Sequence, residues 1–285
     1  MSDENQALTR RHFVTGTVAA ATGASLLNAA PRSSRVVIVR DQNALDAGHA
    51  VNSAALKQML AQTLTRFTGK PDVSQAWRSL VTPSDIVGLV HTNHLNKTHP
   101  ELIDLVRASL IESGVPEKNL RMAQGRSSGP RECTALIALP ALKAHWLTGI
   151  GTVLKNYIMF TDSPSSYHDA DNAKLGEIWN APHVKGKTKL VLVDALRPLC
   201  DKGPQPDPRY MWHYNGLIAG SDPVAVETVC LKIIEKKRQA LRGEPWPLSP
   251  PPVCVEMADK KYGLGTSRME EIQLERVGWS TDILV

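Results

Sequence analysis

Short apolar segments alternate with longer amphipathic ones along most of this chain. Runs of three to nine residues rich in Val, Ile and Leu, bounded by polar or turn-forming residues, predict strands at 34–41, 85–93, 119–124, 134–140, 189–196 and 217–219. Residues 51–69 and 99–114 instead space their apolar side chains three and four apart, which predicts helices. Strands that are apolar on both faces and alternate with helices are typical of parallel sheets. The sequence therefore predicts an α/β fold with a mainly parallel sheet and helices on both faces.

The 285 residues show no break in composition that would divide them into several domains. We expect residues 31–285 to form a single large α/β domain. Within it, a further helix is predicted from about Gly151, and a long helix is predicted to start at Pro223 with Asp222 as its N-cap. The proline-rich segment 244–252 predicts an extended connection, and the part from about Val253 a C-terminal appendage on the same core.

The first 30 residues read as a targeting segment. Arg10 and Arg11 precede Phe13 in the stretch TRRHFV, and a weakly apolar run and small residues up to Ala30 follow. This pattern is typical of a twin-arginine signal peptide and predicts transfer by the twin-arginine export machinery to the periplasm, or export by an equivalent route. Its apolar run is too short and polar for a stable membrane span. A disordered basic tail is the alternative interpretation.

The charge balance favours a small ligand over a polymer. The formal net charge is +5, and the chain has no Lys/Arg block of the kind expected for nucleic-acid binding. The densest basic run, 232–242, alternates with apolar residues and is typical of the solvated face of a helix. We therefore predict a small anionic ligand and no nucleic acid.

Four cysteines, at 133, 200, 230 and 254, are widely spaced and form no C-x-x-C pair. This spacing argues against iron–sulfur or zinc ligation by this chain alone, and the sequence identifies no cofactor. Two disulfides would be compatible with export. Because twin-arginine substrates fold before export, buried free thiols are the expected state.

Polar residues follow several predicted strands where a parallel sheet places its ligands, outside the carboxyl ends. These strand-end residues are His91, Asn93, His94, Lys143, His145, Asp194, Ser221 and Asp222. Asp222 is explained by helix capping alone. Asp194 is predicted to bind a ligand, to orient His145, to ligate a cation or to cap a turn. The repetition of such residues predicts one shared pocket.

The segment 140–160, PALKAHWLTGIGTVLKNYIMF, carries the densest polar chemistry. Lys143 and His145 are two residues apart in an extended stretch, so their side chains lie on the same side. Gly149 and Gly151 would let the backbone approach a ligand, and the following helix would offer its N–H groups and Lys155. We predict an anion cradle here. The alternative is an ordinary strand-to-helix connection with surface lysines.

A second histidine, His168, lies in the stretch SSYHDADN together with Asp169 and Asp171. One of these aspartates is expected to cap a helix. His168 is predicted to act as a general acid or base, or, with a carboxylate, as a metal ligand, although the spacing matches no standard metal motif.

Four segments together resemble the bacterial and archaeal family called domain of unknown function 362. They are DIVGLVHTNHLNKTHPELIDLVRASLIESGVPEKNL, LPALKAHWLTGIGTVLKNYIMF, LVLVDALRPLCDKGP and GLIAGSDPVAVE, which include Lys143-x-His145, Leu154-Lys155-Asn156 and Asp222-Pro223-Val224-Ala225. The resemblance implies a redox setting, since some members are fused to ferredoxin modules, but this chain lacks their cysteine clusters. Many members have Asp where this chain has Glu227 and an acidic residue where it has Gln124, so a metal at those positions is not expected.

The sequence lacks the motifs of serine hydrolases and zincins. We predict an enzyme that acts on a small anionic substrate. His145 and His168 are its candidate catalytic residues, and the candidate ligand-binding residues are Lys143, Lys155, Asn156, Asn93 and Asp194. The alternative is a non-catalytic binding or accessory protein associated with a periplasmic redox complex, for which a redox protein would be the partner.

Overall fold

The structure is a computed structural model that describes residues 33–123, 128–168 and 172–285. The predicted twin-arginine segment, 1–30, lies outside the described residues, as do Gln124, Asp169 and Asp171. In the described ranges, no helix has the length and apolar character needed to cross a membrane.

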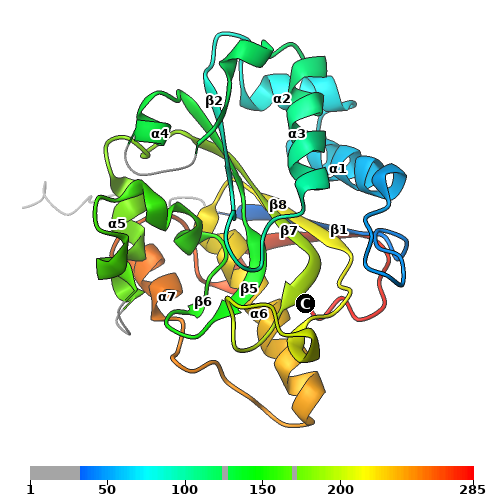
Figure 1. Ribbon diagram of the computed structural model, residues 1–285, viewed down its shortest axis with the longest axis vertical. Coiled ribbons are helices and arrows are strands. Elements are labelled where there is room, and N and C mark those ends of the chain that lie inside the picture. The colour runs from blue at the N-terminus through cyan, green and yellow to red at the C-terminus, as the bar shows by residue number, and fades with distance from the viewer. Residues whose placement is uncertain (1–32, 124–127, 169–171) are drawn as a thin grey trace, which may run out of the picture. The chain divides into compact units, whose positions relative to one another are not determined.

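A single sheet organises residues 33–285 (Figure 1). Its main path runs in the order β3-β2-β4-β7-β8-β1-β9, and β5 pairs with both β7 and β6. The strands are β1 (Ser34–Arg40), β2 (Val87–His91), β3 (Leu120–Met122), β4 (Ala135–Leu139), β5 (Ala141–His145), β6 (Gly149–Ile150), β7 (Thr188–Leu199), β8 (Gly216–Gly220) and β9 (Ile272–Gly278). Each strand predicted from the sequence is therefore present.

The α/β class is confirmed, but the sheet is mixed. The β2–β3, β2–β4, β4–β7, β5–β7 and β1–β9 pairs are parallel. Strand β8 runs antiparallel to both β7 and β1, and β5 and β6 form an antiparallel hairpin. A fully apolar strand is buried in the same way whichever direction its neighbours run, so apolar content could not reveal the direction of β8.

The C-terminal part of the chain contributes a strand to the sheet. β9 pairs along its full length with β1, from Ser34 opposite Ile272 to Arg40 opposite Gly278. The predicted C-terminal appendage thus also completes one edge of the sheet.

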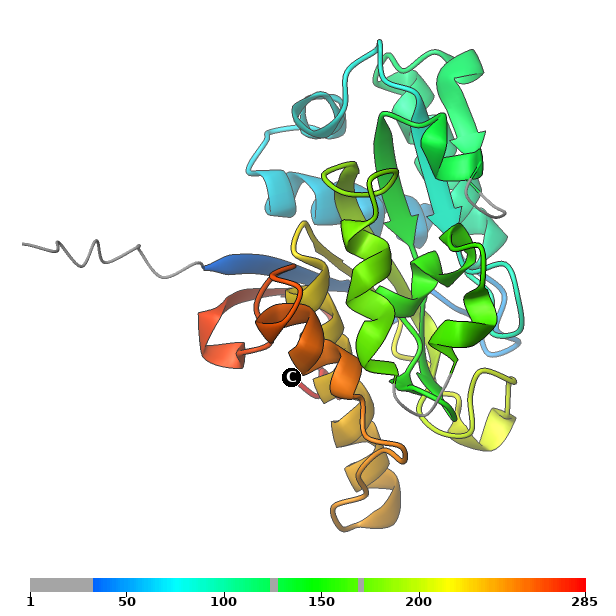
Figure 2. The ribbon, with the colours of Figure 1, turned by 90° about the vertical axis from the view of Figure 1, so that its left-hand side faces the viewer.

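Helices cover both faces of the sheet (Figures 1 and 2). Their bounds are α1 (Ser53–Thr68), α2 (Val73–Leu80), α3 (Pro100–Glu112), α4 (Ser128–Arg131), α5 (Leu175–Asn180), α6 (Pro223–Arg242) and α7 (Val253–Lys260). Short 3-10 helices are η1 (Glu117–Asn119), η2 (Leu154–Phe160), η3 (Pro164–Tyr167), η4 (Asn172–Lys174), η5 (Pro208–Tyr210) and η6 (Met269–Glu271). One hydrophobic core contains side chains of α1, α2 and α3, and the other contains side chains of η2, α5, α6 and α7.

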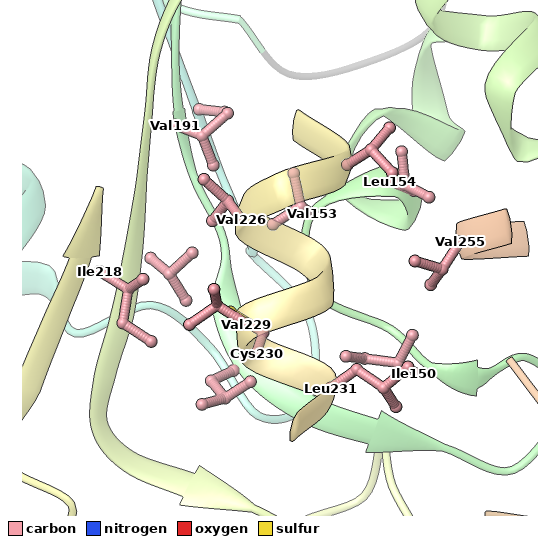
Figure 3. Close-up of a cluster of buried hydrophobic side chains, with 14 of the residues drawn as sticks. Ile150, Val153, Leu154, Val191, Ile218, Val226, Val229, Cys230, Leu231 and Val255 are labelled. Atoms are coloured by element: carbon pink, nitrogen blue, oxygen red, sulfur yellow. The ribbon is translucent and has the colours of Figure 1, made fainter. Parts of the chain in front are cut away.

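The alternation of β1 shows why the central strands are apolar throughout. Val36 and Ile38 belong to the core of α5–α7, whereas Val37 and Val39 belong to the core of α1–α3. Because successive strand residues point to opposite faces, a strand covered on both sides needs apolar residues at every position. Figure 3 shows one of these cores, with side chains of α6 packed between β7 and β8 on one side and the η2 segment on the other.

The helix predicted over residues 51–69 and the predicted Asp222 cap are both confirmed, and the structure adds Asn52 as the cap of α1. The Asn52 side chain accepts hydrogen bonds from the N–H groups of Ala54 and Ala55, and Gly69 ends α1 in the left-handed region. Asp222 caps α6 by accepting from the N–H groups of Val224 and Ala225. The assignment of Asp222 as a structural cap is therefore correct.

The helix predicted from about Gly151 starts later, at Leu154, and is a 3-10 helix. The chain first makes the β5–β6 hairpin and then the 3-10 helix η2. Gly149 sits at the hairpin with φ +70°, and a Cβ there would lie 2.7 Å from the carbonyl oxygen of Pro250. The glycines thus serve the tight turn and its packing against the proline-rich segment.

All four cysteines are buried and free in the structure, as the sequence analysis expected. Burial raises the pKa of the Cys200 thiol to about 11 and those of Cys133, Cys230 and Cys254 above their usual value. These thiols are therefore protonated at neutral pH and are poor nucleophiles.

Candidate functional site

A cavity of about 520 Å³ lies where the carboxyl end of β2 meets β5 and η2. Its walls come from residues 90–95, from β5, from η2 and from His168, which follows η3. The structure brings six of the seven predicted site residues to this cavity: Asn93, Lys143, His145, Lys155, Asn156 and His168. These residues come from four separate segments of the chain.

Lys143 is held inside the protein by β5. Only 4% of the residue is exposed, and its Nζ donates a hydrogen bond to the carbonyl oxygen of Asn96 at 2.8 Å. Burial, and then the charge of Lys155, lowers the Lys143 pKa to about 7, against the opposing influence of Asp194. At neutral pH this amine therefore exchanges readily between its charged and neutral forms.

His145 faces the same cavity from the same strand, as the two-residue spacing predicts. Its Nδ1 accepts a hydrogen bond from the N–H of Leu147 at 3.1 Å, which leaves the proton of the neutral ring on Nε2. Burial, followed by the charges of Lys155, His168 and Lys143, lowers the His145 pKa to about 3. His145 is thus neutral over the physiological range.

Lys155 and His168 both line the cavity, and their side chains contact each other directly. The Lys155 Nζ lies 2.8 Å from His168 Nε2, and His168 Nδ1 lies 2.9 Å from the carbonyl oxygen of Pro164. Since a carbonyl only accepts, Nδ1 carries a proton and Nε2 is the acceptor for the Lys155 ammonium in the neutral ring. Burial lowers the Lys155 pKa to about 8.

Asn156 and Asn93 have different places in the cavity. The Asn156 Nδ2 donates to the carbonyl oxygen of Val90 at 2.8 Å, and its Oδ1 accepts from the Thr92 hydroxyl at 3.4 Å. Asn156 therefore joins η2 to β2 and fixes the distance between two walls. Asn93 is exposed at the rim of the cavity.

Asp194 is not among the residues that line the cavity, although it was predicted as a ligand-binding residue. It is buried, and its Oδ2 accepts from the backbone N–H and the Nδ1 of His99, both at 2.7 Å. Burial lowers the His99 pKa, but the hydrogen bond and charge of Asp194 outweigh it, and the net shift is upward. Of the alternatives considered for Asp194, capping a turn is the one that its hydrogen bonds support, because Oδ1 accepts from the Leu196 N–H at 3.1 Å. The histidine that the carboxylate holds is His99, at the start of α3, and not His145.

Residues 92–232 match a family model described as domain of unknown function (DUF362). This match supports the family that the sequence motifs indicated. No curated protein and no solved structure matches the chain. All six predicted residues that line the cavity fall inside the DUF362 segment, together with Asp194 and Glu227.

Glu227 of the DUF362 segment accepts hydrogen bonds from the backbone N–H groups that were expected to face an anion. Its Oε2 accepts from the Val153 N–H at 2.5 Å, and the N–H groups of Thr152 and Leu154 also act on this carboxyl. The start of η2 is therefore capped from within. Gly151 is also explained by the fold, because a Cβ there would lie 3.0 Å from the Cβ of His145.

The environment of Glu227 keeps it protonated. It is completely buried, and burial outweighs its backbone hydrogen bonds and raises its pKa to about 8. Its other oxygen, Oε1, has no hydrogen-bond partner within the described part of the chain. Sequence reasoning noted this position only as a departure from the family.

The apolar wall of the cavity also escaped sequence analysis. It includes Val90, Ala123, Ile158, Met159 and Phe160, of which Met159 is the exposed member. The sequence MF at 159–160 is typical of ordinary core, and only the fold brings these two residues to the same cavity as the lysines. Within residues 33–123, 128–168 and 172–285, no three His, Cys, Asp or Glu side chains gather in a way that could hold a metal ion.

Proposed function

We propose that this protein binds a small organic or inorganic anion in the DUF362 cavity and is an enzyme that moves protons on it with Lys155, His168 and His145. The observation that carries this proposal is the pair of buried lysines. Lys143 and Lys155 line the same cavity, and burial lowers the pKa of each. No described carboxylate forms an ion pair with either lysine. Buried cations normally have such a partner. A bound anion would supply it.

The residues divide into two roles. Lys143 and Lys155 would hold the anion by charge, since an opposite charge a few ångströms away favours the protonated amine. The Lys155–His168 contact offers a proton that can be given or taken near neutral pH. Neutral His145, with its proton on Nε2, is suited to donate a hydrogen bond to the substrate rather than to carry charge.

Thermal unfolding with acetate or phosphate tests the binding site. At a hundredfold excess over Kd, a ligand of the native state stabilises it by about 2.7 kcal/mol. Lys143→Met and Lys155→Met keep most of the apolar stem but remove the charge, so they should abolish most of this response. The matched controls are Lys232→Met and Lys236→Met, on the outer side of α6, which should keep it.

An equal response in all four variants would mean nonspecific stabilisation by salt, and the site would have to be abandoned. Loss of the response in Lys143→Met and Lys155→Met alone supports the proposal. Co-purification with a membrane redox complex, together with an anion response that none of the four variants changes, would instead favour an accessory protein.

We also propose that the twin-arginine machinery exports this protein to the periplasm. The support is the Arg10-Arg11 pair before Phe13. Changing both arginines to lysine should leave full-length precursor in the cytoplasm, as seen by fractionation and mass analysis. Normal processing of that variant would exclude this route.

A further inference from the structure

The cavity has two chemically different walls, and the short helix η2 contributes to both. Its first turn supplies Lys155 and Asn156, and its last residues supply Ile158, Met159 and Phe160. The cationic wall is completed by Lys143 of β5, and the apolar wall by Val90 at the end of β2. The lining of the cavity therefore combines cationic and apolar side chains.

The size of the cavity argues against a simple inorganic ion as its natural occupant. Its volume of about 520 Å³ lies within the range of roughly 300–1,000 Å³ in which proteins enclose whole organic ligands. Phosphate or acetate, with only a few heavy atoms, would fill a small part of it. The remaining space borders the apolar wall.

The exposed Met159 is a second indication. Its side chain lines the cavity, yet 45% of the residue is exposed, whereas the neighbouring Ile158 and Phe160 are buried in the core. Methionine is flexible and polarisable and adapts to apolar ligands of different shapes. An organic tail against Met159 would cover apolar surface that otherwise contacts water.

The two lysines set the sign of the charge on the head group. Lys143 and Lys155 line the cavity, and no described carboxylate forms an ion pair with either. The head group is therefore an anion. Free phosphate has no hydrocarbon part to meet the apolar residues of the cavity, whereas a carboxylate can carry an organic tail.

We propose that the ligand is a monocarboxylate with an apolar tail, its head between Lys143 and Lys155 and its tail against Met159 and the rest of the apolar wall. This inference rests on the proposed anion site and names its substrate class. The carboxylate supplies the counter-charge that the lysines lack, and the tail fills the space that a small ion leaves.

A carboxylate series tests the tail. Acetate, butyrate and hexanoate carry the same charge and differ only in the number of methylene groups, and their Kd values can be measured by calorimetry or thermal unfolding at pH 7. Each methylene that becomes buried should tighten binding by about fourfold, the equivalent of about 0.8 kcal/mol. Hexanol, which has the same tail and no charge, should bind much more weakly than hexanoate.

A matched pair of variants places the tail. Met159→Gln should weaken hexanoate binding by about threefold to tenfold and leave acetate unchanged, because only the apolar contact is altered. Met122→Gln is the control: Met122 is 47% exposed, close to the value for Met159, but is not among the cavity residues. Both side chains are exposed enough for the variants to fold.

The outcomes separate the two proposals. If acetate, butyrate and hexanoate bind equally while Lys143→Met still removes binding, the tail inference is overturned and the anion site stands. If hexanol binds as well as hexanoate, the head group is not recognised and the inference is overturned as well. If neither acetate nor phosphate has any effect, the proposed function fails and the inference fails with it.

Discussion

Arg238 and Lys143 are both buried cations, but the protein gives them very different surroundings. The Arg238 guanidinium donates to the carbonyl oxygens of Cys200, Trp246 and Pro247, forms an ion pair with Asp201, and lies 3.9 Å from the centre of the Trp246 ring. Its charge is therefore neutralised and its N–H groups are used. It joins the end of α6 to two loops.

Arg40, at the end of β1, has similar surroundings but forms no ion pair with a described carboxylate. It donates to the carbonyl oxygens of Tyr214 and Thr281 and lies between the rings of Tyr214 and Trp279, at 4.1 and 4.3 Å from their centres. Arg40 thereby fastens the chain beyond β9 to the sheet. Structural cations in this protein are surrounded by acceptors and aromatic rings.

The cavity lysines lack such surroundings. The Lys143 ammonium donates to one carbonyl oxygen, and Lys155 contacts a histidine, although both residues are buried. An ammonium has three N–H groups to satisfy, and burying it without a counter-charge costs free energy. Lys143 and Lys155 therefore make fewer stabilising contacts than Arg238 and Arg40, and an anion bound as proposed above would supply a counter-charge.

The largest expected effect is a difference in the free energy of unfolding between variants of Arg238 and of Lys143. Arg238→Met should lower the free energy of unfolding by about 3–5 kcal/mol, because it leaves Asp201 and several carbonyl groups without their donor. Lys143→Met should not lower it at pH 7, because the change removes a buried cation that forms no ion pair with a described carboxylate. Urea unfolding of the two variants beside the native protein measures both.

The same urea measurements can contradict the distinction between Lys143 and the buried arginines. If Lys143→Met loses as much stability as Arg238→Met, Lys143 is a structural residue like the arginines. The distinction between the two regions would then be lost.

A second effect concerns Glu227, the buried acid next to the cavity. Its pKa of about 8 in the folded protein exceeds its ordinary 4.5, so the folded state holds a proton that the unfolded chain releases. Stability should therefore fall as pH rises from about 5 to 8. Glu227→Gln has a side chain of the same shape that does not titrate. Its free energy of unfolding, relative to that of the native protein, should therefore increase by about 3 kcal/mol across that range.

Denaturation curves at pH 5, 6, 7 and 8 test this prediction. Parallel pH profiles for the native protein and Glu227→Gln would show that the acid is ionised at neutral pH, against the assignment made from its burial. Asp72→Asn, at the exposed cap of α2, is the control that should not change the slope above pH 5.

The smallest expected effect is the pH dependence of anion affinity. Lys143 and Lys155 have pKa values of about 7 and 8 in the ligand-free protein, so both lose charge as pH rises from 7 to 9. The Kd of acetate should increase at least about tenfold over that range, a change of about 1.4 kcal/mol. Calorimetry in buffers of different ionisation enthalpy should also detect proton uptake on binding at pH 8. A constant Kd would mean that the lysines do not hold the anion.

Local features of the fold were readable from the sequence because each depends on neighbouring residues. Gly69 sets the end of α1, Asp222 sets the start of α6, and the fully apolar stretch of β1 predicts its burial on two faces. The common side of Lys143 and His145 followed from strand geometry alone.

The arrangement of strands and of partners could not be read in this way. The direction of β8 was missed because apolar strands carry no sign of their neighbours' direction. The expectation that the N–H groups at the start of η2 bind an anion was wrong, because Glu227, 74 residues beyond Val153, accepts their hydrogen bonds. The partner of Asp194 could not be chosen among the open alternatives for the same reason, since His99, which it contacts, lies 95 residues before it.

The sequence by itself determined the α/β class, most of the element boundaries, and the lysines and histidines that meet in the cavity. Only the tertiary structure decided that Lys143 and Lys155 are buried without a described carboxylate partner, and that Met159 and its apolar neighbours share their cavity. The physical reason is distance along the chain. Local spacing fixes helices, strands and caps, whereas the pKa and the partner of a buried side chain depend on segments that only folding brings together.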